Sequence, residues 1–352
     1  MKPKVTVLTC VYNGLPYLKE AIDSTLNQTY SDFEYLIIDD CSPDKEVVKF
    51  IESYDDPRIR LVKNEVNLGV SETMNKAFAM IDTPYVVRID QDDVNLPNRV
   101  EEQIGYLESH PDIDIVCSWE HTIDSNGKIL GNWKRKLDNY GEFLGYILIA
   151  LCPIWHPSIS FRKQSMLDAG GFNHDYLRAE DFEVTTRLAL KRYSAAVIQE
   201  FHLLQRQHDD RQSIEFCDAQ QEVTRRIHNE AVENFLGHPD AKILAAFLRL
   251  EGDPLCGKRN KENIKIIDIL LKDLFAQVKE KQELTDVELK SLKRIIFKRI
   301  GVGIKYTAYL TWLPSFLFLP TFYLLSPQQL PEVRKYASMF YHNVIRKRYF
   351  VK

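Results

Sequence analysis

The chain has 352 residues, of which 45% are hydrophobic and 27% are charged. These values exclude a collagen-like, low-complexity or largely disordered protein, and the length predicts about two domains. The net charge of −4 is unevenly distributed. Residues 258–352 carry 19 Lys or Arg and 8 Asp or Glu, whereas the first 257 residues carry 27 and 42. An acidic front and a basic rear predict different partners for the two parts.

The six cysteines form no CxxC pair, and several lie in apolar, strand-like runs. This usage is typical of buried thiols in a reducing compartment. The apolar stretch near the start, VTVLTCV, is too short for a signal peptide and is interrupted by threonines. We therefore expect a cytoplasmic protein.

Strand and helix patterns alternate over the first 130 residues. Short β-branched and apolar runs predict buried strands, and apolar residues at helical spacing predict the segments between them as helices. The predicted strands are 4–11, 33–38, 59–62, 85–89 and 113–117. The predicted helices are 15–28, 45–53, 71–81 and 100–109. This alternation predicts an α/β fold, with a mostly parallel sheet covered by helices on both faces.

From about Ser213 the pattern becomes helical. We expect helices at 214–236, 240–250, 263–278 and 285–300, and the last opens on a capping-box sequence, Thr285-Asp286-Val287-Glu288. That helix carries Lys and Arg around an apolar stripe. Residues 306–325 contain no charged residue but two prolines, and a basic cluster, Arg346-Lys347-Arg348, lies near the C-terminus.

Polar residues follow the predicted strands at the points where they end. Thr9–Gly14, Asp39–Ser42, Asn64–Gly69 and Asp90–Asp93 all lie there. Because ligands of open parallel sheets bind beyond the carboxyl ends of the strands, these segments predict one shared site. The acidic run after YVVRI is either a solvated turn or a pair of hard oxygen ligands for Mg²⁺ or Mn²⁺. No GxGxxG or P-loop motif is present.

Eight ordered motifs give the chain a specific resemblance. They are VTVLTCVYNG, FEYLIIDDCSPD, NEVNLGVSETMN, YVVRIDQDD, HPSISFRK, GGF, AEDFEVTTRL and RQHDDRQS. Together they resemble a family 2 glycosyltransferase of the inverting, GT-A type found in bacterial polysaccharide and lipid-linked glycan synthesis, over residues 1–215. The resemblance implies the Rossmann-like GT-A sheet and a sugar transfer from a nucleotide donor.

The resemblance also assigns the donor site by position. Thr9 and Tyr12 match residues that contact the uracil and ribose, and Asp40 matches the carboxylate that accepts a hydrogen bond from the uracil imide. Asn67 and Gly69 match the loop over the ribose and diphosphate. The remaining implied donor contacts are Arg88, Asp90 and Arg206.

The same resemblance implies the metal and the acceptor side. Asp92, together with His208, would hold Mn²⁺ or Mg²⁺, although a lone histidine is equally well structural. Asp181 matches the base that deprotonates the acceptor hydroxyl. Glu180, Trp155 and His156 match the segments on the acceptor side.

The expected function is therefore metal-dependent, inverting transfer of a sugar from a UDP-sugar, or a dTDP-sugar, to a hydroxyl of a glycan or lipid-linked glycan during cell-surface polysaccharide synthesis. One alternative is a nucleotidyltransferase acting on sugar phosphates, which would require a Gly-rich, lysine-containing loop that the sequence lacks. Another is a non-catalytic nucleotide-binding scaffold, which the presence of Asp92 and Asp181 disfavours. Nucleic acid is an unlikely partner because no binding motif accompanies the basic charge.

The expected domains are a GT-A catalytic domain at 1–215, a helical extension at 216–300, and a hydrophobic, basic segment at 301–352. The basic helix and residues 306–325 predict peripheral contact with anionic lipid at the inner face of the plasma membrane. A soluble helical core is the alternative for the same segments, and a simple membrane span is disfavoured by the prolines.

Overall fold

The computed structural model describes residues 2–208, 217–238, 240–249 and 260–307. The described chain divides into two compact units. The first comprises the residues up to Tyr140 together with Cys152–Thr224, and the second comprises Gly141–Leu151 with the residues from Arg225 on. A short segment that the sequence places within the first domain, Gly141–Leu151, thus groups with the later helices. The three-part domain division itself stays a prediction.

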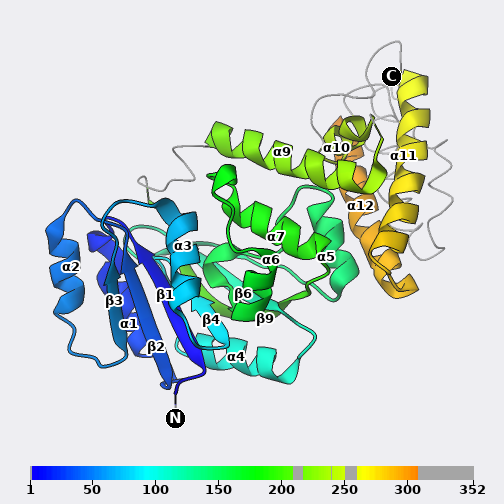
Figure 1. Ribbon diagram of the computed structural model, residues 1–352. Coiled ribbons are helices and arrows are strands. Elements are labelled where there is room, and N and C mark those ends of the chain that lie inside the picture. Colours follow the sequence, from blue (N-terminus) through cyan, green and yellow to red (C-terminus); the bar gives the residue numbers. More distant parts are fainter. Residues whose placement is uncertain (1, 209–216, 239, 250–259, 308–352) are drawn as a thin grey trace, which may run out of the picture. The chain divides into compact units, whose positions relative to one another are not determined.

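The first unit is built on one mixed sheet (Figure 1), with strand order β3-β2-β1-β4-β8-β6-β9-β5 and β7 paired with β6. Strands β1 (Val5–Val11), β2 (Phe33–Asp39), β3 (Ile59–Lys63) and β4 (Tyr85–Arg88) run parallel, as predicted. The other strands are β5 (Val94–Asn95), β6 (Ile115–Ile123), β7 (Ile129–Trp133), β8 (Ser160–Arg162) and β9 (Ala195–Arg206). Of their pairings, β6 with β9 is parallel, while β8 joins β4 and β6 antiparallel.

Both faces of the parallel part are buried, which explains its continuous apolar strands. Val5, Val7 and Val11 belong to a core that includes residues of α1 (Leu15–Leu26), α2 (Lys45–Glu52) and α4 (Arg99–Ser109). The alternate residues of β1 face the other side, where Cys10 Sγ contacts Met74 Sδ of α3 (Gly69–Met80) at 3.5 Å. The predicted α/β fold with helices on both faces is confirmed, and these four helices begin and end within two residues of the predicted positions.

Strands β5, β7, β8 and β9 were not predicted. Two of them are only two and three residues long, too short for a periodic pattern to register. Between them lie α6 (Lys163–Ala169), α7 (Glu180–Leu190) and the 3₁₀ turns η1 (His156–Ser158) and η2 (His174–Tyr176). Of the residues that the sequence assigns to the acceptor side, Trp155 directly precedes η1, His156 opens η1, and Glu180 opens α7.

The later helices are α9 (Cys217–Leu236), α10 (Ala241–Arg249), α11 (Asn260–Lys281) and α12 (Asp286–Thr307), and α5 (Tyr140–Ile147) packs with them. The capping box is present, because Thr285 N donates to Glu288 Oε2 at 2.8 Å and Glu288 N donates to Thr285 Oγ1 at 3.2 Å. At Gly141 the α5 backbone meets α12 so closely that an added Cβ would lie 2.0 Å from the Glu288 carbonyl oxygen. Only glycine permits this approach.

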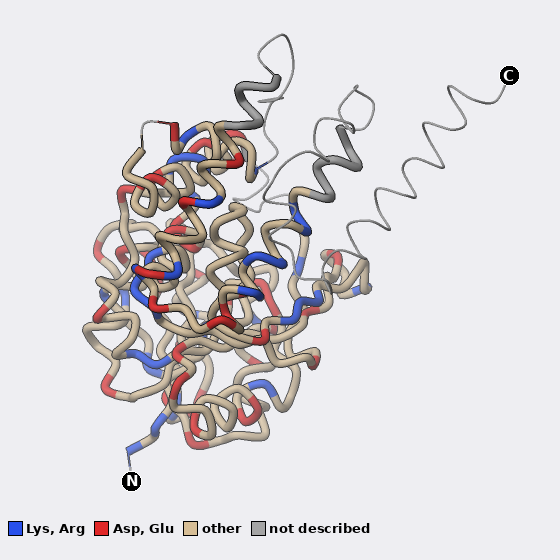
Figure 2. The backbone as a smooth tube through the Cα atoms, turned by 90° about the vertical axis from the view of Figure 1, so that its right-hand side faces the viewer, with Lys and Arg blue, Asp and Glu red and all other residues tan. Residues whose placement is uncertain are grey.

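The predicted lipid-facing helix is packed into the second unit. Leu292, Ile296 and Ile300 are buried, Arg294 pairs with the buried Glu142, and Arg299 donates to the Arg249 carbonyl at 2.9 Å. Acidic and basic residues are interspersed along the described backbone (Figure 2). No helix among the described residues is long and apolar enough to cross a membrane. The uncharged segment lies outside the described residues except for its first two positions.

Candidate active site

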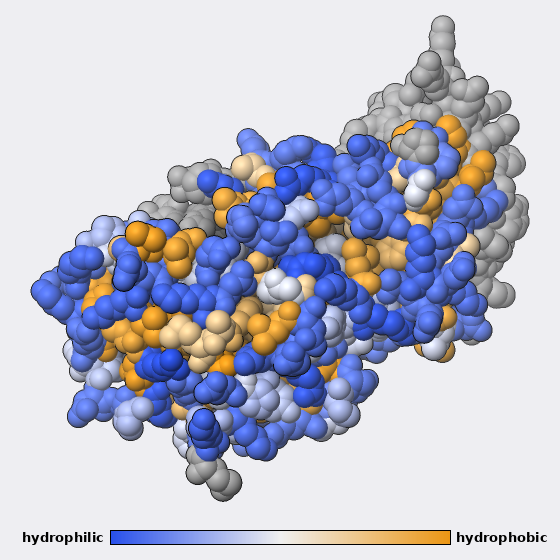
Figure 3. Space-filling view, viewed as in Figure 1, coloured by the Kyte–Doolittle hydropathy of each residue, from blue (hydrophilic) through white to orange (hydrophobic). Residues whose placement is uncertain are grey.

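Three polar loops meet at the carboxyl edge of the parallel strands. Val11 pairs with Asp39 in the β1–β2 register, and Asp40 N donates to the Val11 carbonyl at 2.8 Å. On the other side of β1, Ile89 N donates to the Leu8 carbonyl at 3.1 Å. The loops after β1, β2 and β4 therefore lie side by side, as the strand ends predict. On the face viewed in Figure 3, apolar residues are grouped over β1–β3 and α3 within a largely hydrophilic surface.

The loop after β1 is held by a residue that the sequence analysis did not single out. Gln91 Oε1 accepts from Tyr12 N at 2.8 Å, and Gln91 Nε2 donates to the Tyr12 carbonyl at 3.1 Å. This two-bond contact resembles a strand pairing and fixes the Tyr12 backbone, while the Tyr12 side chain is 42% exposed. A side chain at Gly14 would displace the Gln91 amide, because an added Cβ would lie 2.5 Å from Gln91 Oε1. The structure thus presents a fixed, exposed aromatic ring.

Asp40 organises the loop before α3. Its buried carboxylate accepts hydrogen bonds from Leu68 N, Gly69 N and Asn64 Nδ2 at 2.9, 2.8 and 2.7 Å. A carboxylate offers about four acceptor positions, so one remains for a further donor. The predicted bond to a uracil imide therefore stays a prediction, alongside the structural role that the sequence did not assign.

Asn67 and Gly69 form the turn that Asp40 anchors. Asn67 Oδ1 accepts from Gly69 N at 2.9 Å, and Gly69 has a φ of +78°. No atom lies within 4 Å of a Cβ added at Gly69. Glycine is therefore favoured by this positive φ, not by crowding against the protein.

Asp92 and His208 meet although they lie 116 residues apart. His208 Nε2 and Asp92 Oδ2 are 2.9 Å apart, and their side chains are 14% and 21% exposed. Neighbouring ligands of an octahedral Mg²⁺ or Mn²⁺ site lie about 3 Å apart, given bonds of about 2.1 Å, so the pair fits such an ion. Among the described residues no group of three or more His, Cys, Asp or Glu could hold a metal.

Arg206 is engaged within the protein, and its predicted diphosphate contact stays a prediction. The side chain is 1% exposed, and its guanidinium donates to the backbone carbonyls of Asp92 and Ser125 and pairs with Glu20 at 2.8 Å. Its backbone N donates to Asp93 Oδ1 at 2.9 Å. Arg206 thus ties the end of β9 to the acidic loop, because the protein's own acceptors take up its donors.

The Thr9 side chain also contacts other groups of the protein, and its predicted contact with the nucleotide stays a prediction. Its hydroxyl is fully buried and lies 3.1 Å from the Tyr35 hydroxyl, within the core. The β1 pleat explains this, because Thr9 shares the face of Val5, Val7 and Val11. Its side chain therefore faces away from the crevice.

Arg88 links the acidic loop to the acceptor side. Its guanidinium pairs with Asp90 Oδ1 at 2.6 Å and contacts His156 Nδ1 at 2.5 Å and the His156 carbonyl at 3.1 Å. Burial and the Arg88 charge hold the pKa of His156 well below its ordinary value. The imidazole is therefore neutral, and because Nδ1 accepts from Arg88, Nε2 carries the proton. Nε2 is buried, and the ring packs edge to face against Phe172. These contacts hold the His156 ring in place, and the ring in turn holds the Arg88 guanidinium.

Asp181 and Glu180 open α7 beside this cluster. Burial raises the pKa of Asp181, an effect opposed by the hydrogen bond from Phe182 N and by the Arg88 charge, and increased by Asp90. The pKa of Glu180 is also raised, by burial and then by Asp181. The charges of Arg88 and Asp90 thus act on the Asp181 carboxyl group, and those of Asp181 and Arg88 act on the Glu180 carboxyl group. These four residues therefore belong to one site. A desolvated carboxylate at such a position has the properties of a general base.

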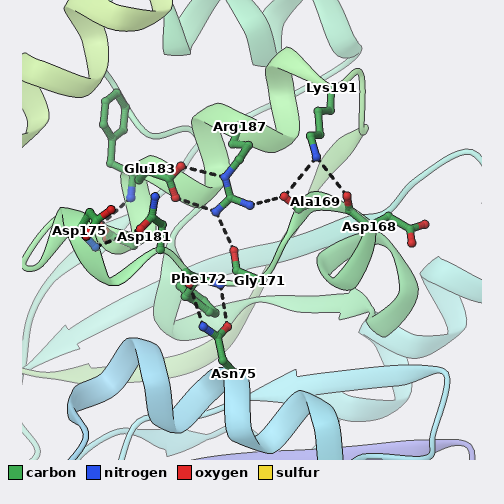
Figure 4. Close-up of polar contacts among 12 residues, drawn as sticks. Asn75, Asp168, Ala169, Gly171, Phe172, Asp175, Asp181, Glu183, Arg187 and Lys191 are labelled. Carbon is green, nitrogen blue, oxygen red and sulfur yellow. Dashed lines mark hydrogen bonds and ion pairs between the residues drawn. The ribbon is translucent and has the colours of Figure 1, made fainter.

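Several contacts that the sequence analysis does not predict hold α7 in place (Figure 4). Arg187 donates to both Glu183 carboxylate oxygens at 2.8 and 2.7 Å, to the Gly171 carbonyl at 2.6 Å, and to the Ala169 carbonyl. Asn75 of α3 bonds both the N–H and the carbonyl of Phe172 at 2.8 Å. These bonds connect α3, α6 and α7 around the GGF loop.

Trp155 lies immediately before η1, partly exposed, with its ring centroid 5.3 Å from that of Trp133.

The sequence analysis also missed Arg99, which is fully buried. Arg99 donates to the Arg88 carbonyl at 2.5 Å and to Asn95 Oδ1 at 2.6 Å, and so holds the backbone at the end of β4 in place. Arg99 opens the segment RVEEQ, whose charged residues predict an exposed helix start, and only the tertiary structure reveals that the Arg99 guanidinium is buried.

Comparisons with known proteins agree with this arrangement. A family model described as glycosyl transferase family 2 matches residues 6–170. An uncharacterized glycosyltransferase of Methanocaldococcus jannaschii is 35% identical over 205 residues, which cover 57% of this chain and 70% of that protein. The O-antigen biosynthesis glycosyltransferase WbnJ of Escherichia coli is 30% identical over 190 residues, covering 52% and 71%.

A solved structure shares the fold at low identity. The crystal structure of S. aureus TarS 1-349 in complex with UDP-GlcNAc superimposes with a TM-score of 0.56 at 16% identity, covering 88% of this chain and 93% of that one. The fold, the family match and the relatives thus agree, and the chain belongs to glycosyl transferase family 2, as a glycosyltransferase with a GT-A fold.

Proposed function

We propose that this glycosyltransferase is metal-dependent and inverting, and that it moves a sugar from a UDP-sugar to a hydroxyl of a glycan or lipid-linked glycan in cell-surface polysaccharide synthesis. The observation that carries the proposal is the arrangement at the end of β4. Asp92, which pairs with His208, lies in the same loop as Asp90, and Asp90 pairs with Arg88, whose charge acts on Asp181. A site for the leaving diphosphate and a base for the acceptor thus adjoin.

Known proteins support the choice of substrates. TarS structures contain UDP-GlcNAc or UDP. A relative in Escherichia coli, 28% identical over 180 residues that cover 50% of this chain and 64% of that protein, is named a UDP-Gal:α-D-GlcNAc-diphosphoundecaprenol β-1,3-galactosyltransferase. We infer a similar class of donor, with dTDP-sugars as the second choice, and an acceptor of the same broad chemistry.

On the donor side, Tyr12 would stack on the base, because Gln91 fixes its backbone and leaves its ring exposed. Asp40 would accept the uracil imide with its remaining position, and the Asn67–Gly69 turn would cover the ribose. Asp90 would bond a ribose hydroxyl. Asp92 and His208 would hold Mn²⁺ or Mg²⁺, which would offset the negative charge that develops on the departing UDP.

On the acceptor side, Asp181 would accept the proton of the attacking hydroxyl. The new C–O bond forms at the anomeric carbon from the face opposite the leaving group, while the bond from that carbon to the UDP oxygen breaks. Such in-line displacement inverts the anomeric configuration. The desolvation that raises the pKa of Asp181 makes its carboxylate a stronger base than an exposed one.

The test is a panel of UDP-, dTDP- and GDP-sugars assayed for release of nucleoside diphosphate, with Mn²⁺, with Mg²⁺ and with EDTA. We expect turnover of one or more UDP-sugars, loss of turnover in EDTA, and inverted configuration by NMR of the product. Turnover that persists in EDTA would contradict the metal dependence. Formation of pyrophosphate from a nucleoside triphosphate and a sugar phosphate would instead support the nucleotidyltransferase alternative.

We also propose a cytoplasmic location with peripheral contact at an anionic membrane. The support is the basic rear of the sequence and the exposed Lys298 of α12. The other cations of that helix contribute less, because Arg294 and Arg299 are engaged by Glu142 and by backbone carbonyls.

A further inference from the structure

Two tryptophans from separate segments form a partly exposed aromatic pair. Trp133 ends β7 and Trp155 precedes η1, and their ring centroids lie 5.3 Å apart with the planes inclined by 35°. Both side chains are partly exposed. The Arg135 guanidinium lies over the Trp133 ring, 5.6 Å from its centroid. We call these three residues the tryptophan platform.

The hairpin explains how Trp133 reaches this position. β7 pairs antiparallel with β6, with Trp133 opposite Glu120, and the described strands place no partner on its other edge. Trp119 on β6 provides a contrast, because its indole N–H donates to the Arg135 carbonyl at 2.8 Å and Lys134 lies over its ring. Within the described residues the Trp133 indole N–H donates no hydrogen bond. Trp119 is thus tied into the hairpin, whereas Trp133 keeps a donor for a ligand.

The tryptophan platform adjoins the residues proposed to activate the acceptor. Trp155 directly precedes His156, which contacts Arg88. Cys152, three residues before Trp155, lies close enough to both Asp181 and Arg135 to be affected by their charges. Burial raises the pKa of its thiol to about 12, with Asp181 raising it further and Arg135 lowering it. Cys152 therefore connects the platform to the side of the site where Asp181 lies.

The chemistry of the platform suits a carbohydrate. Pyranose rings present C–H faces that pack on indole surfaces, and their hydroxyls accept from an indole N–H such as that of Trp133. We propose that Trp133 and Trp155 form an acceptor subsite, which holds a pyranose ring of the glycan acceptor next to Asp181. This inference rests on the proposed function, and it adds the binding surface that selects a sugar acceptor.

The experiment compares steady-state transfer by the full chain and by its Trp133→Leu and Trp133→Phe variants. The acceptor probes are p-nitrophenyl α- and β-glycosides of glucose, galactose and N-acetylglucosamine. Tyr106→Leu is the control, since this ring stacks on His110 at the end of α4 where Glu108 pairs with Lys4, at the opposite edge of the sheet. We expect Trp133→Leu to raise the acceptor KM about fivefold to tenfold, with an unchanged donor KM. Trp133→Phe should remain within about twofold of the original.

The outcomes separate this inference from the proposed function. An unchanged acceptor KM in Trp133→Leu, or a failure of every glycoside to saturate the unmodified enzyme, would overturn the subsite. Donor hydrolysis, measured without any acceptor, tests the proposed function independently. A rise in donor KM equal to that in acceptor KM would indicate a disturbed fold and would also overturn the subsite, and circular dichroism melting of both variants checks the fold directly.

Discussion

Arg88 lies at the centre of the charged groups of the site. It contacts Asp90 and His156 directly, and its charge lowers the pKa of both Asp181 and Glu180 against the effect of burial. The buried Arg99 donates a hydrogen bond to the Arg88 carbonyl, so the core fixes the backbone position of Arg88. The residue matched to a nucleotide contact thus also acts on the proposed base.

Replacement of the proposed base should abolish transfer. In Asp181→Asn the amide cannot accept the proton, and general-base contributions of about 10²–10⁴-fold predict a corresponding loss of kcat. Because the pKa of Asp181 is raised above 3.8, kcat/KM should fall as pH decreases through that higher pKa. A pH profile of kcat/KM for the unmodified enzyme measures this decrease, which forms the acidic limb of the profile. Comparable turnover by Asp181→Asn would refute the assignment of Asp181 as the base.

Removal of the Arg88 charge should move that limb. Arg88 lowers the pKa of Asp181, so Arg88→Gln should raise it and shift the acidic limb of kcat/KM to higher pH. Arg88→Lys should retain the position of the limb more closely. The control is Arg60→Gln, whose ion pair with Glu34 is exposed. An acidic limb that is the same in Arg88→Gln and Arg60→Gln would show that Arg88 does not tune the base.

At the scale of elements, the site depends on how α3, α6 and α7 are joined. Asn75 and Arg187 bind backbone groups of the GGF loop, so α3, which begins at Gly69 of the donor loop, is also connected to the helix that carries Asp181. The glycines of the loop are required for two reasons. Gly170 and Gly171 have φ of +101° and +66°, and a Cβ on Gly171 would lie 2.5 Å from Asn75 Oδ1.

Loss of the Arg187 contacts should destabilise the fold. In Arg187→Gln the carboxylate of Glu183, which is 8% exposed, loses its cation, and we expect a loss of about 2 kcal/mol in the free energy of unfolding. This corresponds to a decrease in Tm of about 4–8 °C for a unit of this size. Arg60→Gln is again the control, because an exposed pair contributes about 0–1 kcal/mol. Equal Tm values for the two variants would contradict the structural role.

At the scale of the whole molecule, the basic rear no longer corresponds to a free basic helix. Helix α12 buries its apolar stripe in the second unit, and α5 packs against it through Gly141. A chain shortened before α11 would therefore expose this core, and the full chain is the appropriate material for membrane experiments.

Binding to vesicles tests the peripheral contact. The full chain should float with vesicles that contain phosphatidylserine, and less with pure phosphatidylcholine, and binding should decrease with salt because exposed charges are screened. A triple substitution, Arg346→Gln, Lys347→Gln and Arg348→Gln, should weaken binding to the anionic vesicles; these positions lie outside the described residues. Equal flotation of the chain with both lipid compositions would contradict an electrostatic contact.

The sequence by itself determined the alternation of strands and helices, the edge at which the polar loops meet, and the family. These follow from local apolar periodicity and from short motifs, both of which depend on near neighbours in the chain. The bounds of the first four helices and the Thr285–Glu288 capping box are of this kind. So is the meeting of the loops after β1, β2 and β4, because parallel strands align their carboxyl ends.

Only the tertiary structure decided what each polar side chain contacts. Arg206 and Thr9 match the family motif, yet one is bound by backbone carbonyls and the other faces the core. Arg99, Gln91 and Trp133 carry no sequence signal, because their partners Arg88, Tyr12 and Trp155 lie 11, 79 and 22 residues away and are brought near only by the fold. Motif position predicts which loop a residue occupies, whereas the pleat, the burial and the distant acceptors determine where its side chain points.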